Sequence, residues 1–568
     1  FDVNIYLEDL RPQFSSEFRS VANSMTNRAP QVKVRGKIME QVNRESRYRV
    51  ASNLTAQITG KLQVPQILDF GRFTKHYQQQ PYIPFPILQN LTPKQVAIFA
   101  ENFTGVSGVE LEIQPTRIYP NSSTAAHLLG YIQRHDRPDD DDEMVYKYYL
   151  PDFVGKTGVE ASFDNSLRGK AGVKSMLVNN VGYRQHEEML SQMEPGKNLR
   201  LTIDLGIQRA AERALALAMP RVRGAVVVMD VNNGDILSLV SLPAFDPNVF
   251  PTGVSSAEWS RWNDEKYSFM FNRATYGARP PGSILKILTA IACFESRVMS
   301  PTETISNPGY YYEPKLLGRR RIDDTAPPGE YNFQRAFIKS SNTYFIHFGL
   351  MAGLKKLVEV GERFHLGEST GILPGEEVSG DYPRSDQLKG WNNGNTANLC
   401  IGQEVTVTPL QIALMTSAIA NGGKLYWPRL IKSLEPFDAE PETNTFRPGV
   451  LRADLHLNPK HLEIIRRAML ADVEDTEGTG KASAVKDLRI AGKTGTAQIT
   501  DGGKVTDHIT WFVSFAPFEK PKYAVVVMVE SGISGGKTCA PVAQKIYEAI
   551  QKLEQTGPTA SARIAGLN

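Results

Sequence analysis

Ser283 and Lys286 stand at the start of a segment whose apolar spacing predicts a helix. One helical turn separates the two side chains, so an amine comes to lie beside a hydroxyl. Burial next to cationic or apolar groups can lower the pKa of that amine until it accepts the serine proton. Backbone N–H groups at the helix start would face a developing oxyanion. The pair predicts nucleophilic acyl transfer, although by itself it fits an N-capping serine and a surface lysine equally well.

The bare Ser-x-x-Lys pattern recurs at Ser483–Lys486 and at Ser534–Lys537. The first run is polar and has little helical signal, and the second lies in a glycine-rich stretch where no helix would fix the pair. Because only Ser283 has a helix-opening context, we take it as the candidate nucleophile.

A second lysine belongs to the run KTGT, at residues 493–496 inside a predicted strand. Lys493, Thr494 and Thr496 can bind a carboxylate from a strand edge, while Gly495 lets a ligand backbone approach. The tripeptide Lys-Thr-Gly also occurs at residues 156–158.

The Gly-Lys-Thr runs also invite comparison with a phosphate-binding loop. The first glycine that such a loop requires is replaced by Leu150, Asp487 and Ser531 in the three instances. A nucleotide site of this kind is therefore excluded.

A third run, residues 339–345, contains Ser340 and Asn342. Ser340 could relay a proton and Asn342 could bind a substrate amide. In isolation this run is an ordinary helix start.

The elements that must position these residues follow from the pattern of apolar residues. Strands are expected at 198–204, 225–230, 235–241, 488–500, 508–515 and 523–530, and helices at 205–218 and 541–553. Asn232-Asn233-Gly234 predicts a hairpin turn, since Asn-Gly accepts positive φ at low cost. Residues 284–470 are mostly helical in pattern. An early hairpin, a helical middle and late strands predict an α+β domain from about 200 to 556.

Composition narrows the class further. The 568 residues are 41% hydrophobic and 22% charged, which is typical of a globular protein rather than of a disordered, collagen-like or coiled-coil chain. The net charge of +3 argues against binding nucleic acid through bulk charge, and three widely separated cysteines exclude a disulfide scaffold. The acidic run at 138–143 is expected to be a solvated loop.

No run approaches the roughly 18 apolar residues that cross a bilayer. The sequence opens at Phe1. We therefore expect that a targeting segment was removed or that the natural chain begins upstream.

Order and spacing join the three motifs. Ser-x-x-Lys, Ser-x-Asn and Lys-Thr-Gly follow one another within one predicted domain, as they do in penicillin-binding proteins and class A β-lactamases. The chain resembles the class B penicillin-binding proteins over about residues 110–555. Arg117–Pro120 (RIYP), Ala126–Tyr131 (AHLLGY) and Gly158–Glu160 (GVE) resemble further motifs of that family, in its non-catalytic pedestal. That resemblance gives the duplicate tripeptide at 156–158 a structural role.

Within the family, residues 342–345, 497–498 and 508–517 are most similar to the elongation-type branch, with the division-type enzyme as the nearer alternative. Two departures stand out. Glu404 replaces the last glycine of a Gly-Gln-Gly run, so the backbone of that loop is expected to differ. Some members of this branch bind zinc near the second motif through Asp, His and Cys. Residues 305–340 contain Asp323 and Asp324 but neither His nor Cys, so we expect no metal and no other cofactor.

The resemblance implies a mechanism. Ser283 would attack the penultimate D-Ala carbonyl of a stem peptide, with Lys286 taking its proton and Ser340 passing a proton to the leaving amine. Asn342 would hold the substrate amide. The terminal carboxylate would be bound by the strand residues Lys493, Thr494, Gly495 and Thr496.

The same resemblance implies a domain plan and partners. Residues 1–200 would form an elongated pedestal, 201–556 a penicillin-binding domain with an antiparallel sheet between helices, and 557–568 a tail. The expected ligands are peptidoglycan stem peptides and β-lactam antibiotics, with a SEDS-family glycosyltransferase and a rod-shape scaffold protein as partners. The catalytic domain would lie in the periplasm, held at the inner membrane by an anchor that these residues do not contain.

Three alternatives remain open. A D,D-carboxypeptidase would use the same residues with water as acceptor. A β-lactamase or penicillin sensor shares the three motifs but usually has a much shorter extracytoplasmic chain. The third alternative is a scaffold that has lost catalysis and only binds morphogenesis partners.

Overall fold

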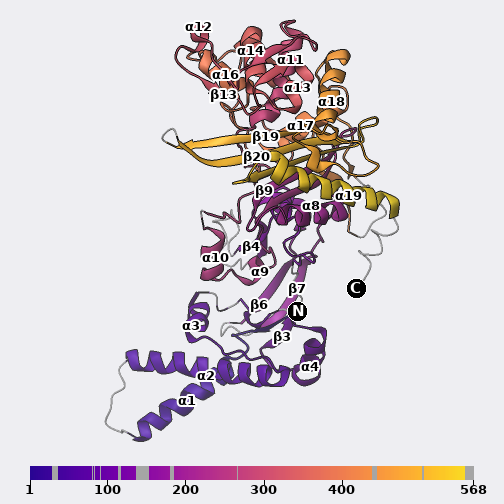
Figure 1. Cartoon of the computed structure of the whole chain (residues 1–568). Helices are drawn as coiled ribbons and strands as arrows, with labels where there is room; N and C mark the ends of the chain where they lie inside the picture. Colours follow the sequence, from indigo (N-terminus) through magenta and orange to yellow (C-terminus); the bar gives the residue numbers. More distant parts are fainter. Residues whose placement is uncertain are drawn as a thin grey trace. The chain divides into compact units, whose positions relative to one another are not determined.

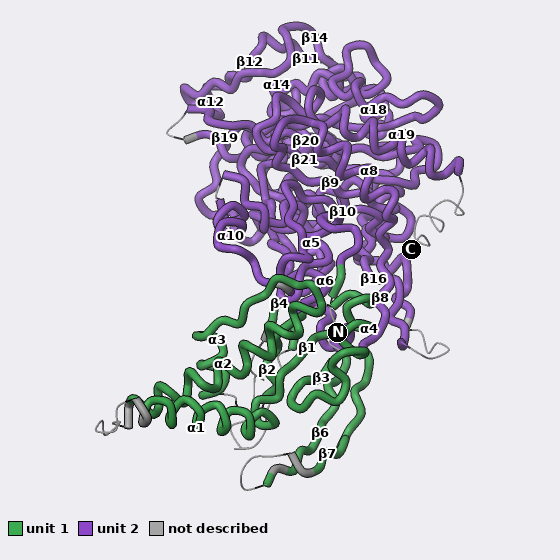
Figure 2. The backbone as a smooth tube through the Cα atoms, turned by 90° about the horizontal axis from the view of Figure 1, so that it is seen from below, with its two compact units in different colours: residues 1–118, 134–153, 169–195 green, residues 119–133, 154–168, 196–568 purple. Residues whose placement is uncertain are grey.

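The chain divides into two compact units that interleave in sequence (Figure 2). The computed structural model describes residues 1–28, 36–79, 81, 83–89, 91–112, 117–135, 152–179, 184–264, 266–437, 444–501 and 504–556. Unit 1 comprises Phe1–Ile118, Arg134–Phe153 and Gly169–Pro195, and unit 2 comprises Tyr119–Gln133, Val154–Arg168 and Gly196–Asn568. Two short segments of the expected pedestal thus pack with unit 2, and the domain limits 1–200, 201–556 and 557–568 stay a prediction. The acidic run 138–143 and the tail 557–568 lie outside the described residues.

Unit 1 contains a small antiparallel sheet in the order β2-β1-β3. Its core combines aliphatic and aromatic side chains, and the rings of Phe73 and Phe85 meet edge to face with 5.8 Å between centroids. The elements of this unit are β1 (Asp2–Ile5), α1 (Arg11–Arg28), α2 (Gly36–Leu62), α3 (Phe70–Gln79), β2 (Phe85–Leu88), α4 (Pro93–Phe103), β3 (Val109–Glu112), β6 (Val173–Val178) and β7 (Arg184–Ser191). The short strands β4 (Ile132–His135) and β5 (Asp152–Gly155) lie where the chain passes between the units.

The central sheet of unit 2 is antiparallel throughout, in the order β10-β9-β21-β20-β19 (Figure 1). Successive side chains of a strand point to opposite faces. On β9, Val227 and Met229 enter one hydrophobic cluster while Val226 and Val228 enter the other. Both faces are buried, which explains the continuous apolar runs in the sequence. The strands are β9 (Arg223–Asp230), β10 (Ile236–Leu242), β19 (Ala491–Asp501), β20 (Lys504–Ala516) and β21 (Tyr523–Glu530).

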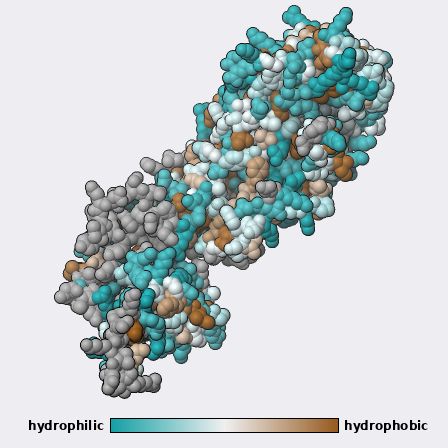
Figure 3. Space-filling model, turned by 90° about the vertical axis from the view of Figure 1, so that its left-hand side faces the viewer, coloured by the Kyte–Doolittle hydropathy of each residue, from teal (hydrophilic) through white to brown (hydrophobic). Residues whose placement is uncertain are grey.

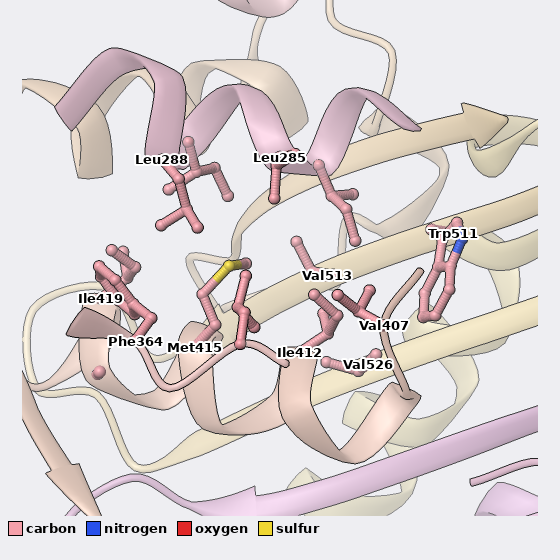
Figure 4. Close-up of a cluster of buried hydrophobic side chains, with 14 of the residues drawn as sticks. Leu285, Leu288, Phe364, Val407, Ile412, Met415, Ile419, Trp511, Val513 and Val526 are labelled. Atoms are coloured by element: carbon pink, nitrogen blue, oxygen red, sulfur yellow. The ribbon is translucent and has the colours of Figure 1, made fainter. Parts of the chain in front are cut away.

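Helices cover both faces of this sheet (Figure 1). On one face lie α8 (Leu205–Ala216) and α19 (Ala540–Thr556). On the other, α11 (Lys286–Glu295) and α17 (Pro409–Ala420) pack against the strands. Figure 4 shows Leu288 at the start of α11 pointing toward Met415 of α17. The expected α+β fold with an antiparallel sheet between helices is confirmed.

The remaining elements of unit 2 form the helical middle, smaller sheets and short connecting helices. The helices are α5 (Ala126–Leu129), α6 (Gly158–Ser162), α7 (Asp164–Leu167), α9 (Val249–Thr252), α10 (Ser256–Trp262), η1 (Gly282–Leu285), α12 (Pro314–Leu317), α13 (Phe333–Ile338), α14 (Asn342–Ala352), α15 (Leu354–Arg363), α16 (Asn393–Cys400), α18 (Pro459–Glu474), η2 (Lys481–Ser483) and η3 (Gly535–Cys539). The strands are β8 (Asn198–Leu201), β11 (Ile305–Asn307), β12 (Tyr310–Tyr311), β13 (Ile322–Asp323), β14 (Gly329–Tyr331), β15 (Lys424–Tyr426), β16 (Ile431–Glu435), β17 (Asn444–Thr445) and β18 (Leu451–Asp454).

The strand expected at 198–204 is shorter than predicted and lies outside the central sheet. It is β8, which ends at Leu201 and pairs with β16. Thr202 bonds two carbonyls through its hydroxyl, and Asp204 accepts a hydrogen bond from the N–H of Ile207 as the N-cap of α8. The polar residues after Leu201 therefore begin the helix rather than extend the strand.

The pedestal motifs that pack with unit 2 are joined by side-chain hydrogen bonds. The hydroxyl of Tyr119 donates to Glu160 at 3.1 Å, and Asn248 bonds both the N–H and the C=O of Tyr119. Gly130 and Thr157 touch so closely that a Cβ on Gly130 would lie 1.8 Å from the carbonyl oxygen of Thr157. The duplicate tripeptide at 156–158 thus lies in the loop that leads into α6, within these motifs.

The surface in view in Figure 3 is mostly hydrophilic, with separate apolar residues scattered over it. In the described part of the chain, no helix combines the length and the apolar character needed to cross a membrane.

Candidate active site

Ser283 and Lys286 lie at the junction of two helices rather than in one α-helix as predicted. Ser283 belongs to the 3₁₀ turn η1, and Lys286 is the first residue of α11. The chain enters this turn through Gly282, whose φ is +57° and whose N–H donates to Gly402 at 2.9 Å. Because the backbone of Gly282 is held in this way, the residues that follow it form a 3₁₀ turn, which is tighter than a turn of α-helix. In a 3₁₀-helix, side chains three residues apart are eclipsed, so the two side chains still share a face.

Lys286 brings the first and second motifs together. Its side chain is fully buried, and its amine donates to the carbonyl of Ser340 at 2.6 Å and to Oδ1 of Asn342 at 2.8 Å. The hydroxyl of Ser340 lies 3.4 Å from the same amine. Ser283 is half-buried, and among the described residues its hydroxyl has no hydrogen-bond partner. Ser283 therefore lies one turn before a buried lysine whose amine is held by the second motif.

Ser340 adopts a backbone conformation that serine rarely takes. Its φ is +57°, in the left-handed region, and its carbonyl accepts hydrogen bonds from Lys286 and from the hydroxyl of Thr325. Strain of this kind persists where surrounding contacts determine the conformation, and it is common at functional sites. The hydrogen bond from Thr325 fixes the Ser340 carbonyl, and this carbonyl accepts the hydrogen bond that holds the Lys286 amine.

Asp324 organises the second motif, and the sequence argument missed it. Its carboxylate accepts the N–H groups of Asn342 at 2.7 Å and Thr343 at 2.8 Å, at the start of α14. It also accepts the hydroxyl of Ser341 at 2.7 Å and the side-chain amide of Asn307 at 2.9 Å. A carboxylate at a helix N-terminus binds free N–H groups and interacts favourably with the helix dipole. The sequence showed Asp324 only as one of two acids without a metal-binding partner.

The third motif lies on β19, directly against η1. A Cβ on Gly495 would come within 2.8 Å of the carbonyl oxygen of Pro281 and 3.0 Å of Ile284. On the other side of the strand, a Cβ on Gly535 would lie 2.7 Å from the carbonyl oxygen of Gly495. Glycine at 495 is thus required by the close approach of η1 to β19, and glycine at 535 by the close approach of η3 to the same strand.

The side chains of the third motif have separate environments. Lys493 is fully buried, and within the described residues its amine donates only to the carbonyl of Thr494, at 3.3 Å. The hydroxyl of Thr494 lies 2.6 Å from that of Thr479, and Thr496 accepts the N–H of Gly535 at 3.3 Å. The Lys493 amine therefore keeps donor capacity that the resting protein does not use.

Burial and neighbouring charges shift the pKa values of both buried lysines. Burial lowers the pKa of Lys286 well below its ordinary value, the charge of Lys493 lowers it further, and Asp324 opposes both effects. Burial also lowers the pKa of Lys493, and Asp472 opposes it. Burial alone would raise the pKa of Asp324, but its hydrogen bonds and the charge of Lys286 hold it below its ordinary value. The shift on Lys286 favours the neutral amine, the form that can accept a proton from a hydroxyl.

The duplicate motifs are in different surroundings. Ser534 and Lys537 lie at η3, where the serine hydroxyl accepts the N–H of Lys537 as a cap. Ser483 ends the short turn η2 and bonds the carbonyl of Gly480. The lysines of both duplicate motifs, Lys486 and Lys537, are exposed, whereas Lys286 is fully buried.

A partly exposed serine one turn before a buried lysine with a lowered pKa, on a sheet with helices on both faces, is the arrangement expected of a serine acyltransferase-type site. Family comparison agrees. The model of the penicillin-binding protein transpeptidase domain matches residues 224–548, and that of the penicillin-binding protein dimerisation domain matches residues 14–201. The chain belongs to the penicillin-binding protein family that joins these two domains.

Individual relatives agree with this assignment. The chain is 33% identical over 503 residues to the peptidoglycan D,D-transpeptidase MrdA of Haemophilus influenzae, which covers 84% of this chain and 75% of that protein. It superposes on penicillin-binding protein 2 of Helicobacter pylori, solved in complex with MreC, with a TM-score of 0.71 and 26% identity, covering 89% of this chain and 91% of that one. A structure from a peptidoglycan synthase complex matches with a TM-score of 0.66 and 28% identity, over 83% and 82% of the two chains.

Proposed function

We propose that this chain is a peptidoglycan D,D-transpeptidase that cross-links stem peptides through an acyl-serine intermediate on Ser283. The observation that carries the proposal is the buried Lys286 amine, held by Ser340 and Asn342 one turn after the partly exposed Ser283. Its lowered pKa suits a base that activates a hydroxyl. The MrdA relatives, which are named D,D-transpeptidases, support the same reaction.

Acylation then runs as follows. The Ser283 oxygen attacks the carbonyl of the penultimate D-Ala, and its proton passes to Lys286. The resulting oxyanion would lie against the backbone N–H groups of Ser283 and Thr496, each such donor being worth about 2.7–4 kcal/mol. The C–N bond breaks, and the terminal D-Ala leaves as an amine after receiving a proton through Ser340. The product is an ester of Ser283.

Deacylation uses the same groups in reverse. An amine of a neighbouring stem peptide attacks the ester carbonyl and loses a proton, and the Ser283 oxygen leaves and regains one. The product is a peptide bond between two stem peptides. A β-lactam would enter as a substrate whose acyl-enzyme is not resolved.

Substrate placement is assigned to the other motif residues. Lys493 has the unused donor capacity that a terminal carboxylate needs, and Thr494, Gly495 and Thr496 line the same strand. Asn342 would hold the substrate amide. In the resting structure its side chain bonds Lys286 and the carbonyl of Asp323, so substrate binding would compete with one of these contacts.

The cellular role that we propose is cell elongation. The relatives named MrdA and the solved complex of penicillin-binding protein 2 with MreC support an elongation-type enzyme with a rod-shape scaffold as partner. The peptidoglycan synthase complex supports a glycosyltransferase partner. We place the catalytic unit in the periplasm of a bacterium, at the inner membrane, by analogy with these relatives. We further propose the pedestal, penicillin-binding and tail regions at 1–200, 201–556 and 557–568.

Covalent labelling by a fluorescent penicillin tests the nucleophile. Wild-type protein should carry a stable label that Ser283→Ala abolishes, while Ser534→Ala, which alters the serine of a duplicate motif, should label normally. Retention of the label in Ser283→Ala would contradict the proposal. Incubation with a donor pentapeptide and an acceptor amine should give cross-linked dimer; release of D-Ala alone would indicate a carboxypeptidase.

A further inference from the structure

Asp472 is a fully buried acid close to the third motif, and the mechanism above does not use it. It lies near the C-terminal end of α18, where the chain turns back so that Gly480 donates its N–H to the Asp472 carbonyl at 2.9 Å. This turn places Thr479 against the carboxylate. Its N–H and its hydroxyl both donate to Oδ1 of Asp472, at 3.1 and 2.7 Å.

Thr479 connects this acid to the strand of the third motif. Its hydroxyl lies 2.6 Å from the hydroxyl of Thr494. A hydroxyl has one proton. Because the Thr479 proton goes to Asp472, Thr494 must be the donor in the second bond. A continuous chain of hydrogen bonds therefore runs from Asp472 to the residue beside Lys493 and fixes its side-chain rotamer.

The second oxygen of Asp472 is the unusual feature. Oδ2 is buried and receives no hydrogen bond from a side chain of the described residues, and only the backbone N–H of Thr494 acts on the carboxyl from the strand. Leaving a charged oxygen unpaired in the interior is costly unless an opposite charge lies close by. Lys493 is that charge: it is fully buried and its own hydrogen bonding is incomplete. The two groups interact electrostatically.

Charge balance across the site points the same way. Two lysines are fully buried here, Lys286 and Lys493, and each would be unstable as a lone buried cation. Asp324 stands next to the first. Asp472 is the corresponding acid for the second. Burial raises the pKa of Asp472, while the charge of Lys493 and the hydrogen bonds from Thr479 lower it, so the ammonium favours the charged form of this acid.

We propose that Asp472 is a positioning residue for Lys493: its carboxylate balances the buried ammonium, and through Thr479 it holds the 493–496 strand ready for the carboxylate of a peptide or β-lactam. The inference rests on the proposed function, because it acts through Lys493 as the group that binds this anion. The inference implies that Lys493 stays protonated up to a higher pH when Asp472 is present than when it is removed.

The sign of the pH effect follows from the neighbours of Lys493. Asp472 on α18 raises the pKa of Lys493 against the effect of burial, and the charge of Lys493 lowers the pKa of Lys286 at the start of α11. Lys537 is the single charged residue of η3. The charged residues of β20 pair with Gln498 or with later positions of β19, so they lie beyond the 493–496 motif. Removing the Asp472 charge therefore lowers the pKa of Lys493, so the ammonium form is lost at lower pH.

The test measures the second-order rate of acylation by a fluorescent penicillin from pH 6 to 10, using the full chain. Asp472→Asn should lower the rate about tenfold or more at pH 8 and move the alkaline limb of the profile down by about one to three pH units. Asp472→Glu should restore part of that shift. Thr479→Val, which removes the link but keeps the charge, should lower the rate without moving the limb.

A matched control separates a local charge effect from general destabilisation. Asp235 is a partly buried acid that pairs with Arg429 away from the site. Asp235→Asn should leave the alkaline limb of the pH profile where it is in wild type. An alkaline limb in Asp472→Asn that coincides with that of wild type would overturn the inference alone. If Asp472→Asn does not fold, the other two variants decide. The inference would be overturned if Thr479→Val acylates at the wild-type rate with an unmoved alkaline limb and Asp472→Glu also acylates at the wild-type rate. Absence of acylation in wild type at every pH would overturn the proposed function as well.

Discussion

Lys286 and Lys493 are both fully buried in one site, yet the regions around them differ. The Lys286 amine is bonded to Ser340 and Asn342, and its acid, Asp324, has hydrogen bonds to both carboxylate oxygens. The Lys493 amine has one long hydrogen bond to its own strand, and its acid leaves an oxygen unpaired. The first region is complete at rest, as a proton-transfer site requires. The second has unsatisfied groups, as a site that awaits an anion requires.

The comparison predicts the largest effect at the completed region. Lys286→Met keeps the length of the side chain but removes the base, so acylation by a fluorescent penicillin should slow by about 10²- to 10⁴-fold. In wild type, the rate should fall as pH decreases through the pKa of Lys286, because the protonated amine cannot accept the serine proton; burial sets that pKa below its ordinary value.

The variant should lose this acid limb altogether. Lys537→Met alters the lysine of a duplicate motif and serves as the matched control, with no change in rate expected. An acid limb that persists in Lys286→Met would assign the base to another group.

The contact between the two regions can be tested at Gly495. Gly495→Ala places a methyl group 2.8 Å from the carbonyl oxygen of Pro281, so β19 and η1 must move apart by a few tenths of an ångström or more. Misplacement of this order should slow acylation by about ten- to a hundredfold. Stopped-flow labelling gives the rate.

Gly60→Ala is the matched control for that change. Its new methyl group meets nothing within 4 Å, in α2 of unit 1. Equal rates in the two alanine variants would show that the approach of η1 to β19 is not what sets the geometry.

The smallest expected effect concerns stability. Asp324→Asn leaves two helix N–H groups and a hydroxyl with a poorer acceptor, which should lower the free energy of unfolding by about 1–3 kcal/mol. Its neighbour Asp323 is exposed and pairs only with the exposed Arg321 through its carboxylate, so Asp323→Asn should cost about 1 kcal/mol or less. Denaturant unfolding measures both. A larger loss in Asp323→Asn would reverse the assignment of the structural acid.

The sequence determined the parts of this protein that depend on local pattern. Continuous apolar runs become the strands β9 and β21, whose alternate side chains fill two cores because a strand has a period of two. The hairpin at Asn233-Gly234 and the closing helix α19 follow from turn chemistry and from helical periodicity. The order of three motifs was enough to select Ser283 and to place the chain in its family.

Tertiary structure decided what identical local patterns become. Lys-Thr-Gly occurs at 156–158 and at 493–495; the first lies in a loop with Gly158 at φ +61°, and the second lies on a strand between η1 and η3. Asp324 and Asp472 meet their lysines only across long separations in sequence, so no spacing rule could find them. Burial, which lowers the pKa values of Lys286 and Lys493, exists only once the helices have packed on the sheet, because desolvation is a property of the whole core.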